Sequence, residues 1–175
     1  PHWPLQVPDQ WLDRYAGMYD VGYEELARQR LARMQALGLV AAGVVPQSLA
    51  PQVRPWATLE PAERRGESRR MELYAAMIEL LDQEVGRLLV RADRAKPGRD
   101  TLVVFLSDNG PEGNSIDRLP LNRFWVPLVF DNSAENLGRV GSYAWYSAGW
   151  AQASASPFRL YKAYTGEGGY RVPAI

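Results

Sequence analysis

Thr101-Leu-Val-Val-Phe-Leu-Ser-Asp-Asn-Gly-Pro-Glu-Gly113 is the most informative stretch of this chain. Its apolar run, residues 102–106, stops abruptly at Ser107, where a series of turn-forming residues begins. A short apolar run rich in Val and Phe is typical of a strand buried on both faces, as in a parallel sheet. Open α/β sheets bind ligands beyond the carboxyl ends of their strands. We therefore expect Asp108 and Asn109 to lie at a ligand-binding edge of a sheet.

The Asp108–Asn109 pair has two interpretations. A carboxylate beside an amide carbonyl suits a hard cation such as Ca2+ or Mg2+, which takes oxygen ligands at roughly 2.0 to 2.6 Å. The same Asp-Asn-Gly sequence is also typical of an ordinary turn, because Asp and Asn tolerate left-handed backbone angles and Gly adopts them easily. Spacing alone leaves both interpretations open.

The residues before this stretch predict helices. Thr58 and Pro61 are typical of a helix start, and the apolar residues that follow recur at steps of three and four, which indicates an amphipathic helix packed on a sheet. Lys96-Pro97-Gly98 would end this helix and lead into the strand, and a helix followed by a parallel strand is typical of an α/β layer architecture. A second helix is predicted over residues 23–37, with Gly38 as its stop signal.

The residues after it are rich in aromatic side chains but show little periodicity. Residues 114–157 include Trp125, Tyr143, Tyr146 and Trp150. Long loops of this kind often form lids or binding walls. The alternative is that the aromatic side chains pack the loop onto the body of the protein as an irregular core.

The composition excludes several classes of function. The 20 acidic and 20 basic residues balance, so we expect neither a nucleic-acid partner nor a basic membrane contact. No apolar segment is long enough to span a bilayer. Cysteine is absent, which excludes disulfides, thiolate metal sites and cysteine nucleophiles within these residues. The compartment and the oligomeric state stay open.

Four separated segments, taken in chain order, resemble the sulfatase family, and specifically the bacterial arylsulfatases of the pseudomonad type. They are Pro1-His-Trp-Pro-Leu-Gln6; Tyr74-Ala-Ala-Met-Ile-Glu79 with Asp82 and Gly86-Arg-Leu88; Ser107-Asp-Asn-Gly-Pro-Glu-Gly113; and Leu160-Tyr-Lys162 with Gly168-Gly-Tyr-Arg-Val-Pro173. The resemblance covers almost the whole chain. No single motif carries it.

The resemblance implies an α/β, alkaline-phosphatase-like fold with a mostly parallel central sheet flanked by helices. We expect that fold to be present only in part, with residues 1–175 forming part of a single catalytic domain whose N-terminal and C-terminal portions lie outside this chain. The implied activity is hydrolysis of a small sulfate monoester to an alcohol or phenol and sulfate. The family uses Ca2+ and a formylglycine made from a Cys or Ser in a motif that this chain lacks, so we expect the chain alone to be inactive.

The resemblance also implies roles for four residues. Asp108 and Asn109 match a pair of Ca2+ ligands. His2 matches a histidine that binds the ester oxygen and protonates the departing alcohol, a task that suits the residue type whose charge changes near neutral pH. Lys162 matches a lysine that contacts the sulfate and the leaving oxygen. We expect these side chains to converge on one pocket.

Three charged residues beside these motifs have no assigned role. We interpret Glu112 and Glu167 as supporting or surface residues and Arg171 as a structural ion-pair partner. Two other functions remain open. One is hydrolysis of phosphonate monoesters or phosphodiesters by a related site, and the other is a non-catalytic metal-binding or interaction domain, which fits a chain without a nucleophile motif.

Overall fold

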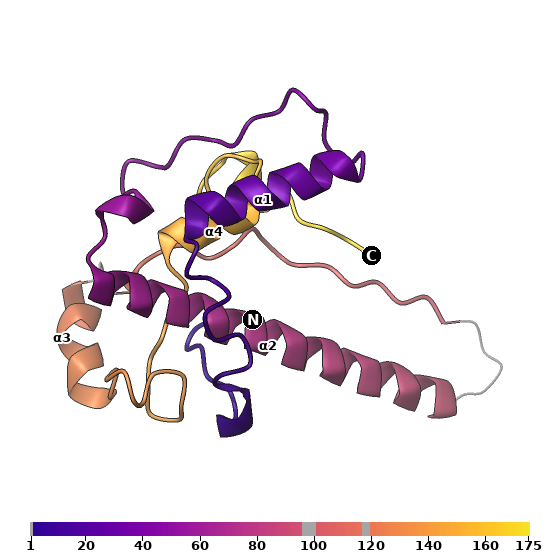
Figure 1. The fold of residues 1–175 in the computed structure, drawn as a ribbon. Helices are drawn as coiled ribbons and strands as arrows, with labels where there is room; N and C mark the ends of the chain where they lie inside the picture. Colours follow the sequence, from indigo (N-terminus) through magenta and orange to yellow (C-terminus); the bar gives the residue numbers. More distant parts are fainter. Residues whose placement is uncertain (1, 96–100, 117–119) are drawn as a thin grey trace.

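The computed structural model describes residues 2–95, 101–116 and 120–175 and is built mainly from helices (Figure 1). Their order is η1 (Asp9–Trp11), α1 (Tyr23–Ala36), η2 (Trp56–Thr58), α2 (Pro61–Ala95), α3 (Pro120–Val129), α4 (Ala148–Ala155) and α5 (Glu167–Tyr170). Helix α1 packs beside α4, and α4 contacts α5. None of the helices in the described part of the chain combines the length and hydropathy needed to cross a bilayer.

Helix α1 confirms the helix predicted over residues 23–37. It ends where Gly38 adopts a left-handed φ of 71°. The Gly38 amide donates to the Gln35 carbonyl, and the Leu39 amide donates to the Met34 carbonyl at 2.9 Å, so these two carbonyls of the last turn have partners. Glycine suits this position because it adopts left-handed angles without steric penalty.

Helix α2 confirms the predicted long amphipathic helix, but only its first half is buried against the rest of the protein. The residues that it buries are Ser68, Met71, Glu72, Leu73 and Ala76. Further along, Leu88 is 65% exposed and Leu89 is 41% exposed. The sheet on which this stripe was expected to pack is absent from the described residues. The predicted helix end at Lys96-Pro97-Gly98 lies outside them.

The predicted buried strand over residues 102–106 is wrong in this structure. The segment is extended, but its side chains are between 47% and 89% exposed. Among the described residues it pairs only with the C-terminal ones: Phe105 and Ile175 exchange two backbone hydrogen bonds, and Leu106 and Ala174 form an isolated antiparallel bridge. A strand buried on both faces needs neighbouring strands and covering helices. The described residues supply neither for this segment, so the mostly parallel sheet is not confirmed.

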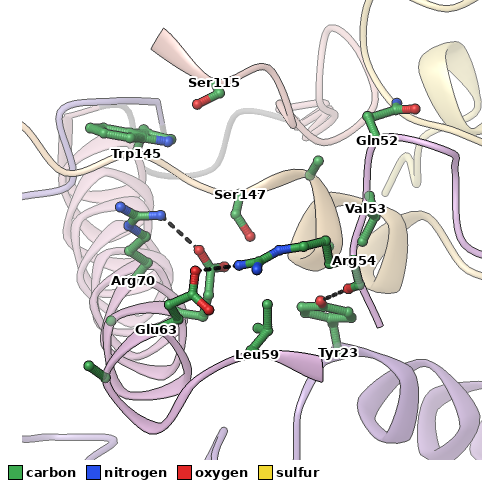
Figure 2. Close-up of a pocket in the computed structure, with 15 residues that line it drawn as sticks. Tyr23, Gln52, Val53, Arg54, Leu59, Glu63, Arg70, Ser115, Trp145 and Ser147 are labelled. Carbon is green, nitrogen blue, oxygen red and sulfur yellow. Dashed lines mark hydrogen bonds and ion pairs between the residues drawn. The ribbon is translucent and has the colours of Figure 1, made fainter. Parts of the chain in front are cut away.

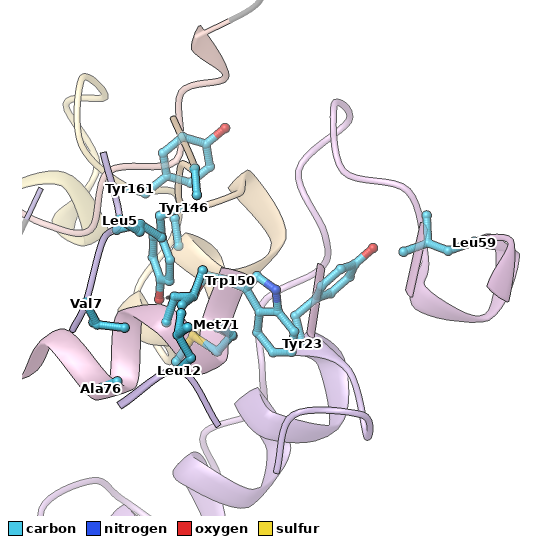
Figure 3. Packing of buried hydrophobic residues seen from close by; sticks show 14 residues of the cluster. Leu5, Val7, Leu12, Tyr23, Leu59, Met71, Ala76, Tyr146, Trp150 and Tyr161 are labelled. Atoms are coloured by element: carbon cyan, nitrogen blue, oxygen red, sulfur yellow. Dashed lines mark hydrogen bonds between the residues drawn. The ribbon is translucent and has the colours of Figure 1, made fainter. Parts of the chain in front are cut away.

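The core lies where the N-terminal segment, the first half of α2 and α4 meet (Figure 3). Trp150 of α4 is fully buried, and its ring makes edge contacts with Tyr19, Tyr23 and Trp56 at centroid distances of 5.6 to 5.9 Å. Its Nε1 donates to the Glu67 carbonyl at 2.9 Å, which ties α4 to α2. A buried indole that also finds an acceptor is a stable anchor.

The aromatic stretch therefore contributes to the core and contains two helices, α3 and α4. Tyr146 and Trp150 are buried, which confirms the irregular-core interpretation for these two residues. Trp125, which lies on α3, is instead 46% exposed. Figure 1 shows the extended segment 101–116 returning from the C-terminal end of α2 toward its N-terminal end. The end of this segment therefore lies near the first half of α2, which is the half that packs against the core.

Candidate active site

Two distant segments meet at the turn that follows the extended segment. The Gly110 amide donates to the Gly169 carbonyl at 2.8 Å, and the Lys162 amide donates to the Pro111 carbonyl at 3.0 Å. A Cβ added at Gly110 would lie only 1.9 Å from the Gly168 carbonyl oxygen. Glycine is therefore required here because two backbones approach closely. This contact fixes the Asp-Asn-Gly turn beside Lys162.

His2, Glu112 and Lys162 form a cluster of charged and polar side chains at this junction. Lys162 Nζ lies 3.4 Å from His2 Nε2 and 3.3 Å from Glu112 Oε2. His2 Nε2 lies 3.9 Å from the same carboxylate oxygen. The structure thus brings together the histidine and lysine that were predicted to converge from distant parts of the sequence. It adds a carboxylate between them.

Glu112 is the most enclosed member of the cluster. Its side chain is 12% exposed, compared with 30% for Lys162 and 49% for His2. Its other carboxylate oxygen, Oε1, accepts hydrogen bonds from the backbone amide and the side-chain amide of Asn114, at 2.8 and 2.6 Å. One oxygen is thus anchored locally, and the other faces the two basic groups.

The contacts of His2 indicate how its ring is oriented. Nδ1 lies 3.3 Å from the Trp3 carbonyl oxygen, which can only accept, so Nδ1 carries a hydrogen. Nε2 faces the Lys162 ammonium, which can only donate, so Nε2 accepts in this contact. In the tautomer that fits these two contacts, Nδ1 carries the hydrogen and Nε2 is presented to the cluster. The Trp3 indole lies against the ring, with centroids 4.4 Å apart.

A strained turn holds Lys162 in place. Leu160 and Ala163, on either side of it, have left-handed φ angles of 64° and 73°. Such angles are uncommon for residues with a Cβ and persist only where the surroundings impose them. The neighbouring Tyr161 is buried, and its hydroxyl accepts a 2.7 Å hydrogen bond from Gln52. The buried tyrosine anchors the turn, which leaves the lysine side chain directed to the cluster.

Asp108 and Asn109 lie on the same turn, four and three residues before Glu112. Asp108 is exposed, and Asn109 is half-buried. The Asn109 amide nitrogen donates to the Gly110 carbonyl at 2.8 Å, so its Oδ1 is the atom that could bind a cation. Carboxylate and amide oxygens suit Ca2+, but the ion takes 6 to 8 oxygen ligands. In the described ranges no group of three or more His, Asp or Glu could hold a metal, so these two oxygen ligands would need several more to complete a calcium shell.

The other two unassigned charged residues pair with each other. Arg171 Nη1 lies 3.2 Å from Glu167 Oε2, and both side chains are largely exposed. The Arg171 guanidinium also lies over the Phe158 ring, 4.7 Å from its centroid. This contact agrees with the interpretation of Arg171 as an ion-pair partner.

A cavity of about 580 Å³ lies between the first turns of α2, the segment before it and the start of α4 (Figure 2). Its charged side chains are paired, Arg54 with Glu63 and Arg70 with Glu67. Hydrogen bonds from the Glu60 amide and from Arg54 lower the pKa of Glu63. Burial raises the pKa of Tyr23 to about 12, so its hydroxyl stays protonated and donates to the Arg54 carbonyl. We therefore regard the His2–Glu112–Lys162 cluster as the better candidate for chemistry.

Sequence reasoning left Glu112 without a role. The available signal was its position directly after Asp-Asn-Gly-Pro, within one of the four family-like segments. That position does not reveal which side chains the carboxylate meets, because its partners come from the two ends of the chain.

Comparison with known proteins gives the same family from a sequence model and from individual relatives. A sequence model of the sulfatase family matches residues 1–175. An uncharacterised sulfatase of Schizosaccharomyces pombe is 41% identical over 177 residues, which cover 100% of this chain and 32% of that protein. An arylsulfatase of Klebsiella aerogenes is 38% identical over 173 residues, which cover 97% of this chain and 36% of that protein. The chain therefore spans about a third of the length of these curated relatives.

Proposed function

This chain belongs to the sulfatase family, and on that premise we propose that it carries part of the active site of an enzyme that hydrolyses sulfate monoesters. The substrate would be a small aryl or alkyl sulfate, and the products an alcohol or phenol and sulfate. The observation that carries the proposal is the meeting of His2 and Lys162 within 3.4 Å, beside the turn that holds Asp108 and Asn109. The relative named arylsulfatase supports the same class of reaction.

Lys162 would bind the sulfate group. Its ammonium is a compact cation with three hydrogens that can be donated to anionic oxygens. As the S–O bond to the alcohol breaks, negative charge grows on the leaving oxygen, and a cation placed beforehand at that position stabilises the transition state. The turn that fixes Lys162 would reduce the reorganisation needed for this contact.

His2 would protonate the leaving oxygen. When the imidazole takes up a second proton, both ring nitrogens become donors. Nε2 faces the Lys162 side of the cluster, so its proton would pass to the alcohol oxygen next to the bound sulfate. A proton supplied in this way typically accelerates such a reaction by about 10²- to 10⁴-fold.

Asp108 and Asn109 would supply two of the ligands of a Ca2+ ion. When bound, this cation would add positive charge near the sulfate oxygens. The remaining ligands, and the formylglycine nucleophile that the family resemblance implies, would come from elsewhere in the protein. The chain on its own would therefore not turn over substrate.

The proposal is tested by kinetics of the complete protein with 4-nitrophenyl sulfate. Replacing Lys162 by methionine keeps much of its length and removes its charge. We expect kcat/KM to fall by about 10²-fold or more, as when a single stabilising donor is removed from other active sites. Arg33→Met, which removes an exposed cation on α1, is the matched control and should leave kcat/KM unchanged.

Three results would contradict the proposal. Wild-type activity in the Lys162→Met variant would remove the lysine from the site. Faster hydrolysis of bis(4-nitrophenyl) phosphate than of 4-nitrophenyl sulfate would point to a phosphodiesterase. No turnover of either ester by the complete protein would favour a non-catalytic role.

A further inference from the structure

We propose that Glu112 is a positioning and specificity-determining residue that holds Lys162 and His2 together and tunes the site for esters with a single negative charge. This inference rests on the proposed function, because it assigns a role within the same site. Three observations carry it. They are the position of the carboxylate between the two basic groups, its anchoring by Asn114 and its low exposure.

The geometry gives Glu112 a defined orientation. Two hydrogen bonds from Asn114 hold Oε1, so the carboxylate cannot turn without losing both of them. Oε2 then stays 3.3 Å from Lys162 Nζ and 3.9 Å from His2 Nε2. A lysine has four flexible side-chain bonds, and a fixed carboxylate restricts where its ammonium can lie. Glu112 would thereby place the cation that receives the sulfate.

The same carboxylate would allow two positive charges to lie together. A protonated His2 would stand 3.4 Å from the Lys162 ammonium, and two like charges at this separation repel. Glu112 faces both and offsets that repulsion. Its side chain is only 12% exposed, so water and salt weaken its field less than at an open surface.

Glu112 also sets the net charge that an anionic substrate meets. Lys162 contributes +1, Glu112 contributes −1 and His2 contributes 0 or +1, so the cluster carries 0 or +1. Removing the charge of Glu112 raises this sum by one unit. A sulfate monoester carries one negative charge, whereas a phosphate monoester carries about 1.5 to 2 at pH 7. Glu112 should therefore disfavour the phosphate monoester relative to the sulfate monoester.

The test compares two esters that share a leaving group, 4-nitrophenyl sulfate and 4-nitrophenyl phosphate, in the complete protein. In Glu112→Gln the charge is lost while the size is kept. We expect the ratio of kcat/KM for sulfate over phosphate to fall by about 10-fold, the effect of a modest change in charge interaction inside a site. Damage to the fold alone would lower both values together and leave the ratio unchanged.

Two further variants sharpen the test. Glu112→Asp keeps the charge on a shorter side chain, so the ratio should return toward the wild-type value even if kcat falls for both esters. Glu135→Gln, at an exposed position, is the matched control and should change neither the ratio nor kcat. An unchanged ratio in Glu112→Gln would overturn the inference.

A binding measurement separates this inference from the proposed function. Isothermal titration of methyl sulfate, a monoanion, and of inorganic sulfate, a dianion, needs no turnover. The Glu112→Gln variant should bind inorganic sulfate more tightly relative to methyl sulfate than the wild type does. If this shift occurs in a protein without activity, the proposed hydrolysis fails and the role of Glu112 stands. If turnover occurs without any shift, the role of Glu112 fails and the hydrolysis stands.

Discussion

Gly110 shows how one missing side chain can shape a site. Because its Cα lies against the Gly168–Gly169 backbone, the Asp-Asn-Gly turn and the Lys162 turn share hydrogen bonds although they are more than 50 positions apart in the sequence. The glycine thus places the proposed cation ligands and the lysine on one junction. A glycine that served only to allow a left-handed backbone angle would not have joined these two distant segments.

The proposed calcium ligands can be tested without an activity assay. Ca2+ at 100 times its dissociation constant should stabilise the metal-free complete protein by about 2.7 kcal/mol, measured as a rise in the unfolding midpoint. We expect Asp108→Ala and Asn109→Ala each to reduce this rise, because each removes an oxygen ligand. Asp93→Ala, at an exposed position near the end of α2, is the control. An equal rise in all four proteins would exclude Asp108 and Asn109 as ligands.

Individual site residues differ in how far the sequence reveals them. His2 and Lys162 stand in family-like segments, and their types already suggest acid and cation roles, so their meeting could be predicted. Glu112 could not be assigned in the same way. Its role depends on a carboxylate oxygen pointing between two side chains from opposite ends of the chain, and the tertiary contacts with His2 and Lys162 are not visible in the sequence around Glu112.

The packing of α4 on α1 depends on another glycine. A Cβ added at Gly149 would lie 2.5 Å from the Tyr23 ring, which is buried between the two helices. We expect Gly149→Ala to lower the free energy of unfolding by about 1 to 3 kcal/mol, because over-packing forces neighbouring side chains out of place. Denaturant unfolding of the protein, followed by tryptophan fluorescence, would measure this.

A second helical glycine provides the matched control. Gly86 lies in α2 and is exposed, and a Cβ added there would meet no side chain and no other segment of the chain within 4 Å. Gly86→Ala should raise the free energy of unfolding by about 0.5 to 1 kcal/mol, since alanine favours helix and meets no clash. If both variants change stability in the same direction, the proposed contact with Tyr23 does not decide the effect at Gly149.

Helices α1 and α2 were predictable, whereas the absence of the expected sheet from the described residues was not, for one physical reason. Periodic apolar positions and Gly38 are local signals, so the sequences of α1 and α2 are sufficient to predict both helices. A buried strand depends on partners that its own sequence does not specify. Residues 102–106 have the composition of such a strand, yet in the described structure they meet only the C-terminal residues along one edge.

At the scale of the whole molecule, apolar side chains are exposed on three parts of the described structure. They lie on the second half of α2, along residues 102–106 and on α3, where Leu121, Phe124 and Leu128 are each more than 70% exposed. Folded proteins seldom expose large contiguous apolar patches unless something binds there. The relatives that match this chain are about three times as long, so they contain further sequence that could cover these surfaces.

These surfaces predict self-association of the 175-residue chain. Unpaired extended segments with apolar side chains act as templates for pairing between copies. We expect sedimentation velocity to show oligomers in the micromolar range, where such exposed surface promotes association. Val103→Lys combined with Phe105→Lys should shift the chain toward the monomer. Val140→Lys, a control that changes a single exposed side chain in a turn, should not.

Local stability is distributed unevenly along helix α2. The first half of the helix packs against the core, whereas the second half exposes its leucine side chains. Backbone amides exchange with solvent through local opening, which is easier where few apolar contacts must be broken. Amide protection should therefore decline along the helix, with residues 68–76 opening only when the core does and residues 85–95 fraying independently. A single continuous helix would then behave as two cooperative units.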